Sequence, residues 1–218
     1  DNAERAAALA EYLNELNGSR ESLERSIYLA ASKQAQEQFD PAGDAALVVA
    51  GRGWHSGVIG IVASRLVEKF HRPVVVIALD ELGIKPGVGS ARSVPGFDLH
   101  AALCACTETL ISHGGHAAAA GLKVDPARVD EFRSMFVEYA SSEISSAQRT
   151  AELRVDAEVP FSSLSAEVVQ LLERLAPFGC GNPRPVLCTE GVVLGERHLA
   201  LRLDQHGKRI RSVAFGGG

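Results

Sequence analysis

The sequence predicts an α/β protein whose last part is rich in short β-strands. Three observations support this class. Residues 2–38 carry apolar side chains at helical spacing. Two short apolar runs, 45–50 and 73–79, enclose a helical pattern, as in a β-α-β unit. After residue 153, strand patterns alternate with turn residues. At 218 residues and 46% hydrophobic content, the chain can bury a substantial core in one or two domains.

The first half of the chain contains a long helix and the β-α-β unit. The helix over 2–38 has Gly18 as its one weak point, and we expect it to act as a connector. The apolar runs suit buried strands. One helical face between them carries five apolar side chains: Val58, Ile59, Val62, Leu66 and Phe70.

The middle of the chain begins with residues 83–96, whose glycines and prolines predict a loop. Asp98 is placed to cap a helix that runs to about Leu110. A Gly114-Gly115 turn, an alanine run and a strand near 121–124 follow. Pro126 then opens a helix that ends in the Ser- and Ala-rich residues 140–150, a predicted domain boundary.

The last part changes character. Residues 153–159 alternate like a half-exposed strand, 165–175 suit a helix, and 177–183 form a rigid Pro- and Gly-containing loop. Strands are predicted at 185–194, 199–204 and 210–215. The first residue is Asp1 rather than methionine, inside a helical pattern, so we expect the chain to be a fragment of a longer protein.

Charge and composition exclude several classes. The net charge of −5 argues weakly against a nucleic-acid partner, but residues 195–211 retain a basic strip. No apolar run is long enough for a membrane span and no signal peptide is visible, so we expect a cytoplasmic protein without a membrane partner. The four cysteines have no metal-binding spacing, and reduced thiols are expected.

Three segments carry residues suited to a phosphate. The Gly114-Gly115 pair beside His116 allows close backbone approach, although a tight turn packed on the alanine run explains it equally. Residues 87–93 combine glycines, two hydroxyls and Arg92, whose planar fork suits a phosphate; the alternative is a loop with a solvated arginine. His55 precedes a helix whose glycines, 57 and 60, serve either ligand approach or packing.

Other chemistries are missing from the pattern. Residues 87–93 match neither a Walker loop nor a dinucleotide fingerprint. The sequence has no nucleophile elbow and no dense carboxylate and histidine cluster that could hold two catalytic metals. Phosphate-contacting elements are therefore predicted without the machinery to cleave a phosphodiester.

Five motifs together resemble the RecJ family of bacterial single-strand-specific DNA exonucleases. They lie in family order across nearly the whole chain: Leu13-Asn-Glu-Leu-Asn17, Gly53-Trp-His-Ser-Gly-Val-Ile-Gly-Ile-Val-Ala63, Gly89-Ser-Ala-Arg-Ser93, Gly114-Gly-His116 with Ala119-Ala-Gly121, and Pro177-Phe-Gly-Cys-Gly-Asn-Pro183. The resemblance implies a connecting helix at 1–40, a DHH-associated domain with a mixed sheet and flanking helices at 41–150, and a partial OB-type β-barrel at 151–218. The parent enzyme would degrade single-stranded DNA from the 5′ end in recombination and repair.

The resemblance also implies where the chemistry lies. Manganese or magnesium would be bound by an N-terminal DHH domain of the same polypeptide, whose Asp-rich and Asp-His-His motifs do not occur in this sequence. We therefore expect no catalytic residue, metal ligand or bound cofactor in this chain. The chain should bind single-stranded DNA without cleaving it.

The residues carried over from the family are substrate contacts. The expected phosphate contacts are Ser90, Arg92, Ser93, Gly114, Gly115, His116, His55 and, as the weakest of them, Arg20. In the OB-type domain the expected DNA contacts are Arg197, His198, Arg202, Lys208, Arg209 and Arg211, with simple solvation of a hairpin as the alternative.

Two rival functions stay open. The chain could belong to another DHH-family phosphoesterase that acts on short oligonucleotides or cyclic dinucleotides. It could also be a non-catalytic interaction module. Because few residues follow residue 150, the predicted barrel is short of strands, and its open edge could pair with a second copy.

Overall fold

The structure is a computed structural model that describes residues 2–40, 43–145, 154–189, 193–194, 200–205 and 208–213. The chain divides into two compact units, Asp1–Ala151 and Glu152–Gly218. Each unit is described by itself.

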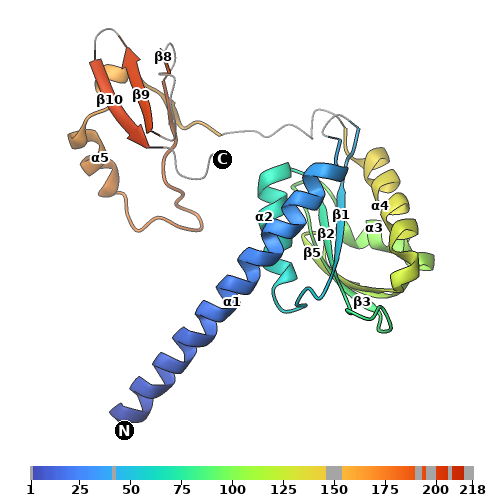
Figure 1. The fold of residues 1–218 in the computed structure, drawn as a ribbon. Helices are drawn as coiled ribbons and strands as arrows, with labels where there is room; N and C mark the ends of the chain where they lie inside the picture. Colours follow the sequence, from blue (N-terminus) through green and yellow to red (C-terminus); the bar gives the residue numbers. More distant parts are fainter. Residues whose placement is uncertain are drawn as a thin grey trace. The chain divides into compact units, whose positions relative to one another are not determined.

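A five-stranded mixed sheet forms the centre of the first unit (Figure 1). Its strands are β1 (Leu47–Arg52), β2 (Val74–Leu79), β3 (Gly87–Arg92), β4 (Leu110–Gly115) and β5 (Ala119–Val124). The spatial order is β1-β2-β3-β5-β4, with β1 and β2 parallel and the other neighbours antiparallel. The β-α-β unit and the mixed sheet are confirmed.

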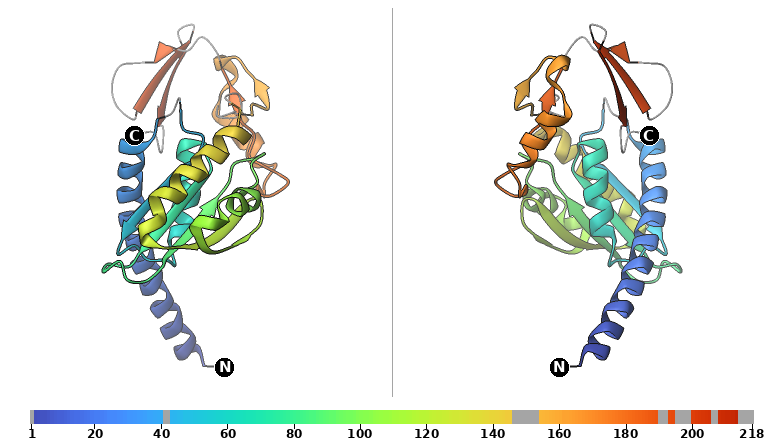
Figure 2. Two further views of the ribbon diagram at one scale, coloured as in Figure 1. Left: turned by 90° about the vertical axis from the view of Figure 1, so that its right-hand side faces the viewer. Right: turned by 90° about the vertical axis from the view of Figure 1, so that its left-hand side faces the viewer.

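Helices cover both faces of this sheet (Figure 2). α1 (Ala3–Gln38) and α2 (Ile59–Phe70) lie on one face, while α3 (Leu99–Ala105) and α4 (Val129–Glu143) lie on the other. The two faces have separate apolar cores. One contains Val62 and Leu66 of α2 beneath Ile27 of α1, and the other contains Phe132 and Phe136 of α4.

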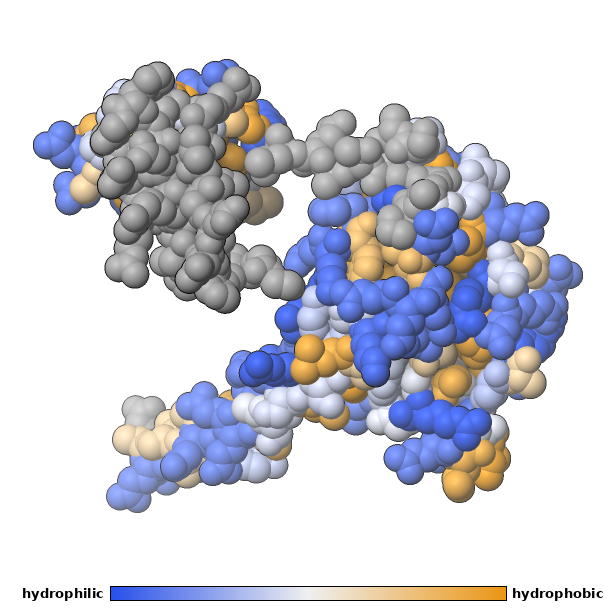
Figure 3. Space-filling view, turned by 45° about the horizontal axis from the view of Figure 1, so that its top comes forward, coloured by the Kyte–Doolittle hydropathy of each residue, from blue (hydrophilic) through white to orange (hydrophobic). Residues whose placement is uncertain are grey.

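The long helix α1 packs on the sheet only through its C-terminal part. Its buried residues are Ile27, Ala31, Ser32 and Ala35, whereas Leu13 is 61% exposed. Gly18 does not interrupt the helix. Hydrophilic and hydrophobic residues both lie on the surface of the projecting part (Figure 3).

The prediction of a loop over residues 83–96 is wrong for its central part. Residues 87–92 form β3, with Gly87, Gly89 and Ala91 buried on one face. A Cβ on Gly89 would lie 2.7 Å from the side chain of Leu122, and one on Gly87 would lie 2.7 Å from that of Leu79. These glycines leave room for large side chains of neighbouring strands, which is a packing role that composition alone does not distinguish from a loop.

The predicted Gly114-Gly115 turn is also misplaced. Both glycines lie at the end of β4, and the chain reverses over residues 116–118 before β5. Gly115 has a φ of +141° and its hypothetical Cβ would lie 2.5 Å from Cα of Ala120, so a larger residue does not fit there. The backbone N–H of His116 donates to the carbonyl of Ala119 at 2.9 Å and closes the hairpin.

Short 3-10 turns adjust the predicted helix ends. Asp98 caps α3 as predicted, accepting from the N–H groups of His100 and Ala101. The helix ends at Ala105 rather than near Leu110, and a 3-10 turn (Thr107–Thr109) leads into β4. A second such turn (Pro126–Arg128) precedes α4.

The described residues of the second unit form two small sheets and one helix. β6 (Ala157–Glu158) pairs in parallel with β7 (Leu187–Cys188), and β8 (Val193–Leu194), β9 (Ala200–Gln205) and β10 (Lys208–Val213) follow in the order β10-β9-β8. A 3-10 turn (Phe161–Ser163) and α5 (Ala166–Glu173) lie between β6 and β7 in the chain. The strand predicted over 153–159 is therefore limited, among its described residues, to 157–158.

Backbone bonds between Gly179 and Asn182 and the Asn182 side chain hold the predicted rigid loop at 177–183. The amide group of Asn182 donates to the carbonyls of Leu175 and Pro177, at 2.9 Å each.

Among the described residues of both units, no helix has the length and apolar character needed to cross a membrane.

Candidate functional site

Ser90 and Arg92 lie on the same face of β3 because strand residues two apart point to one side. One guanidinium nitrogen, Nη1 of Arg92, donates to Oγ of Ser90 at 3.1 Å and to the carbonyl of Ala91 at 2.8 Å. The Arg92 side chain therefore folds back along its own strand. Ser90 fixes the guanidinium in place.

The first turn of α2 lies against this guanidinium. A Cβ on Gly60, the second residue of α2, would lie 2.9 Å from Nη2 of Arg92 and 3.2 Å from Oγ of Ser90. Glycine at this position leaves the space that the guanidinium occupies. Because helix N-termini attract anions, Arg92 and α2 present positive potential at one place.

Arg92 has no acidic partner among the residues that the structure describes. Its hydrogen bonds within this part of the chain use Nη1 alone, so Nε–H and the Nη2 hydrogens have no protein acceptor there. These two nitrogens form one edge of the planar fork, the arrangement that binds two oxygens of a phosphate or carboxylate in parallel. The half-buried Arg92 can therefore bind an anion without first breaking an ion pair.

The sheet beside Ser90 is a floor of small residues. Ser90 pairs across the strands with Gly121 of β5, which pairs with Gly114 of β4, and Arg92 pairs with Ala119. Cross-strand partners share one face of an antiparallel sheet, so these residues lie on the face that carries Ser90 and Arg92. Gly114 and Gly121 are both exposed.

Packing against the residues that the structure describes does not explain glycine at these two positions. A Cβ on Gly114 would meet nothing within 4 Å, and one on Gly121 would meet only the carbonyl oxygen of Gly89, at 3.8 Å. Neither residue has a positive φ. The bare backbone is thus available for close contact with a ligand.

His116 and Ser93 have different positions relative to this floor. His116 is exposed just beyond β4, and its backbone is fixed by the bond to Ala119. The hydroxyl of Ser93 donates within its own turn, at 2.7 Å to the carbonyl of Phe97 and at 3.1 Å to that of Val94. Ser93 therefore holds the turn after β3, and its hydroxyl hydrogen is already engaged.

His55 is exposed in the loop before α2. Its Nδ1 accepts from the backbone N–H of Gly57 at 3.0 Å, which shapes that loop and leaves Nε2 outward. No contact within the described part of the chain joins His55 to Ser90 or Arg92. The structure brings together Ser90, Arg92 and the first turn of α2, but it does not bring His55 into contact with them.

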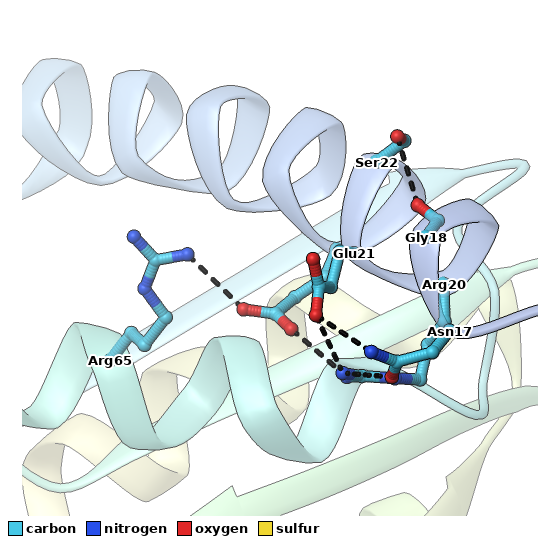
Figure 4. A network of polar contacts seen from close by, with 7 residues as sticks. Asn17, Gly18, Arg20, Glu21, Ser22 and Arg65 are labelled. Atoms are coloured by element: carbon cyan, nitrogen blue, oxygen red, sulfur yellow. Dashed lines mark hydrogen bonds and ion pairs between the residues drawn. The ribbon is translucent and has the colours of Figure 1, made fainter. Parts of the chain in front are cut away.

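Arg20 lies in a separate polar network between α1 and α2 (Figure 4). Its Nη1 pairs with Glu24 at 3.2 Å, and its Nε and Nη2 donate to Oδ1 of Asn17. Arg65 of α2 binds the other oxygen of Glu24 at 3.1 Å and stacks over the ring of Tyr28. Each of the three guanidinium nitrogens of Arg20 is thus engaged by a residue of α1, and the Arg65–Glu24 pair is the contact of this network that joins α1 to α2.

The basic residues predicted in the second unit are only partly described. Arg202 lies on β9 opposite Arg211 of β10, Arg209 lies opposite Asp204, and Lys208 lies opposite Gln205. Arg197 and His198 lie outside the described residues.

Thr107 and His113 form a contact that the sequence motifs did not single out. The Thr107 hydroxyl donates its only hydrogen to the carbonyl of Cys104 at 2.7 Å, so the 3.0 Å contact with Nε2 of His113 requires that Nε2 carry the proton. Nδ1 of His113 is then a buried acceptor without a partner in the described structure. This bond fastens β4 to the turn after α3, just before Gly114.

The described residues do not fit a metal ion. No group of three or more His, Cys, Asp and Glu side chains gathers in a suitable geometry within the described ranges. The site described above provides cationic and backbone donors, which suit an anion rather than a cation.

Family models match both units. Residues 43–142 match the model of the DHHA1 domain, and residues 155–218 match that of the RecJ OB domain. Among curated proteins, the single-stranded-DNA-specific exonuclease RecJ of Bacillus subtilis is 31% identical over 223 residues, which cover 98% of this chain and 28% of that protein. RecJ of Thermus thermophilus is 34% identical over 221 residues, covering 99% and 30%.

Solved structures agree with these matches. The crystal structure of Thermus thermophilus RecJ with Mg²⁺ has a TM-score of 0.77 and 28% identity, covering all of this chain and 33% of that one. The Mn²⁺ complex of the same protein has a TM-score of 0.76. The chain spans about a third of the length of these relatives. It therefore belongs to the RecJ family, and it corresponds to the region of RecJ that contains the DHHA1 and OB domains.

Proposed function

We propose that this chain is the substrate-binding part of a RecJ-type exonuclease and that it holds the phosphates of single-stranded DNA. In this proposal the Nε–Nη2 edge of Arg92 binds a phosphate and Ser90 orients the guanidinium. The sugar-phosphate backbone of the DNA passes over Gly114 and Gly121. His116 contacts the strand beyond the hairpin. The observation that carries the proposal is the carboxylate-free guanidinium beside a floor of exposed glycines.

The proposal includes a division of the chain into three parts. We assign residues 1–40 to a connecting helix, 41–150 to the DHH-associated domain and 151–218 to an OB-type domain. The basic residues of the OB-type domain, including Arg202 and Arg211, would contact the DNA backbone further along the strand.

The hydrolytic chemistry belongs, in this proposal, to the part of the relatives that this chain does not cover. Two-metal hydrolysis of a phosphodiester needs a dense set of carboxylate and histidine ligands. Two crystal structures of Thermus thermophilus RecJ are complexes with Mg²⁺ and Mn²⁺. We expect the isolated chain to bind single-stranded DNA and to leave it intact when either metal is added.

Binding of a fluorescent octathymidylate, measured by anisotropy at several salt concentrations, tests the proposal. Arg92→Ala should weaken binding by about 1.5–3 kcal/mol, the contribution of hydrogen bonds to a charged group. Arg92→Lys should restore binding only in part, because lysine keeps the charge but loses the planar fork. Arg5→Ala, which removes an exposed charge on α1, is the matched control. If Arg92→Ala binds as tightly as Arg5→Ala, the phosphate site is not at Arg92.

A further inference from the structure

A second row of side chains lies on the same face of the sheet, where residues of β4 and β5 are exposed. Val88 of β3 pairs with Lys123 of β5, and Lys123 pairs with Ser112 of β4. Cross-strand partners share a face, so this row lies on the face of Ser90, Gly121 and Gly114. Buried Ala120, Leu122 and Val124 alternate with the residues of β5 on this face.

Lys123 is a cation without a partner in the described part of the chain. It is exposed and makes no ion pair or hydrogen bond with any described residue. The nearest acidic residue in the sequence, Asp125, uses its carboxylate to accept from the backbone N–H of Ala127 at 2.9 Å. The ammonium group therefore has no neutralising acid among the contacts of its own strand end.

The row is set apart from Arg92 by a defined distance along the strands. Lys123 is two residues from Gly121 and four from Ala119, the partners of Ser90 and Arg92. A rise of about 3.3 Å per residue places it about 7 Å and about 13 Å from these positions. An extended polynucleotide that is held by its phosphate at Arg92 reaches this row with a following phosphate.

We propose that Lys123 and Ser112 form a second phosphate subsite for the same single strand. The Lys123 ammonium supplies charge and the exposed Ser112 hydroxyl supplies a hydrogen bond to a phosphate oxygen. Val88, which pairs with Lys123 and is 38% exposed, provides apolar surface for a sugar or base. The single-stranded DNA then runs along β5, from Arg92 past Gly121 to Lys123.

This subsite rests on the proposed function, and the experiment separates the two. Octathymidylate binding is measured as a function of salt for Lys123→Ala, Arg92→Ala and a control, Lys33→Ala. Lys33 also carries one positive charge, but it lies on α1 next to Glu37, 3.9 Å away. Lys123→Ala should weaken binding about threefold to fivefold at low salt, as expected for one exposed charge pair. It should also reduce the slope of log K against log salt by about 0.7, the value for one phosphate contact with a single strand.

A conservative variant and a short ligand complete the test. Lys123→Arg should bind as tightly as the original chain. Thymidine 5′-monophosphate has a single phosphate, and its binding at Arg92 should not change in Lys123→Ala. If Lys123→Ala loses no more affinity than Lys33→Ala while Arg92→Ala is impaired, the second subsite is wrong and the function stands. If neither Lys123→Ala nor Arg92→Ala weakens binding, both proposals are wrong.

Discussion

Replacing Gly60 with alanine should impair DNA binding without unfolding the protein. The added Cβ would lie 2.9 Å from Nη2 of Arg92, 3.2 Å from Oγ of Ser90 and 3.7 Å from Cζ of Arg92. These atoms belong to side chains, and the guanidinium is the far end of a flexible one. We therefore expect the guanidinium to move while the backbone of α2 stays in place.

The two free energies should respond differently. Alanine is favoured over glycine within a helix by about 0.5–1 kcal/mol, which offsets the loss of the Arg92 contacts with Ser90 and Ala91. The free energy of unfolding should therefore change by no more than about 1 kcal/mol. Loss of the aligned Nε–Nη2 edge removes charge-assisted hydrogen bonds that contribute about 1.5–3 kcal/mol, so octathymidylate should bind roughly tenfold to a hundredfold more weakly.

A double-mutant cycle tests the cause of this loss. Anisotropy titrations are made with Gly60→Ala, Arg92→Ala and the double variant, and urea unfolding checks each fold. The double variant should bind like Arg92→Ala alone, since Gly60 acts through Arg92. Gly18→Ala, where the new Cβ meets nothing within 4 Å, should bind normally. Normal binding by Gly60→Ala, or an equal loss when Arg92 is already absent, would show that Gly60 does not act through Arg92.

Three other perturbations follow from the structure. Gly114→Ala should leave urea unfolding unchanged, because the added Cβ meets nothing within 4 Å. It should weaken octathymidylate binding by about 1–3 kcal/mol, the usual cost of adding a methyl group to space that is already filled. Unchanged binding would mean that no ligand lies over Gly114. His113→Gln should still reach Thr107 with a donor and keep the binding affinity, whereas the shorter His113→Asn should lose both, and the amide hydrogens of β4 should then exchange faster. Equal behaviour of the two variants would show that the Thr107–His113 bond does not hold β4 in place. Burial raises the pKa of the Cys106 thiol from 9.0 to about 11, so this thiol should label slowly at pH 8 while exposed Cys104 labels fast. The folded state should also lose stability as pH rises from 9 to 11, because the thiol ionises first in the unfolded chain. Rapid labelling of both thiols in the folded protein would contradict this.

Periodicity was sufficient for the parts of the fold where one face is apolar. The helix α1, the β1–α2–β2 unit and the Asp98 cap were predicted within a few residues, since burial or local hydrogen bonding fixes them. β3 was not, because Gly87 and Gly89 have no side chain to show an alternating pattern. Their buried position depends on side chains of the neighbouring strands, Leu79 of β2 and Leu122 of β5, and the pairing of these strands is not visible in a local pattern.

The candidate site was predictable in its residue types but not in its geometry. Ser90 and Arg92 could be paired by their spacing once they are known to lie on a strand. That Gly60 makes room for the guanidinium, and that Gly114 lies across from Gly121, depends on tertiary pairing. Arg20, which the family resemblance implied as the weakest phosphate contact, stays a prediction, and only the structure places Asn17 and Glu24 against its guanidinium.

The most direct measurement is a titration of the chain with octathymidylate followed by backbone amide NMR. We expect saturable shifts at Ser90, Arg92, Gly114 and Gly121 that fade as salt is raised. Saturable binding whose shifts are confined to residues 152–218, with none on β3, β4 or β5, would contradict it.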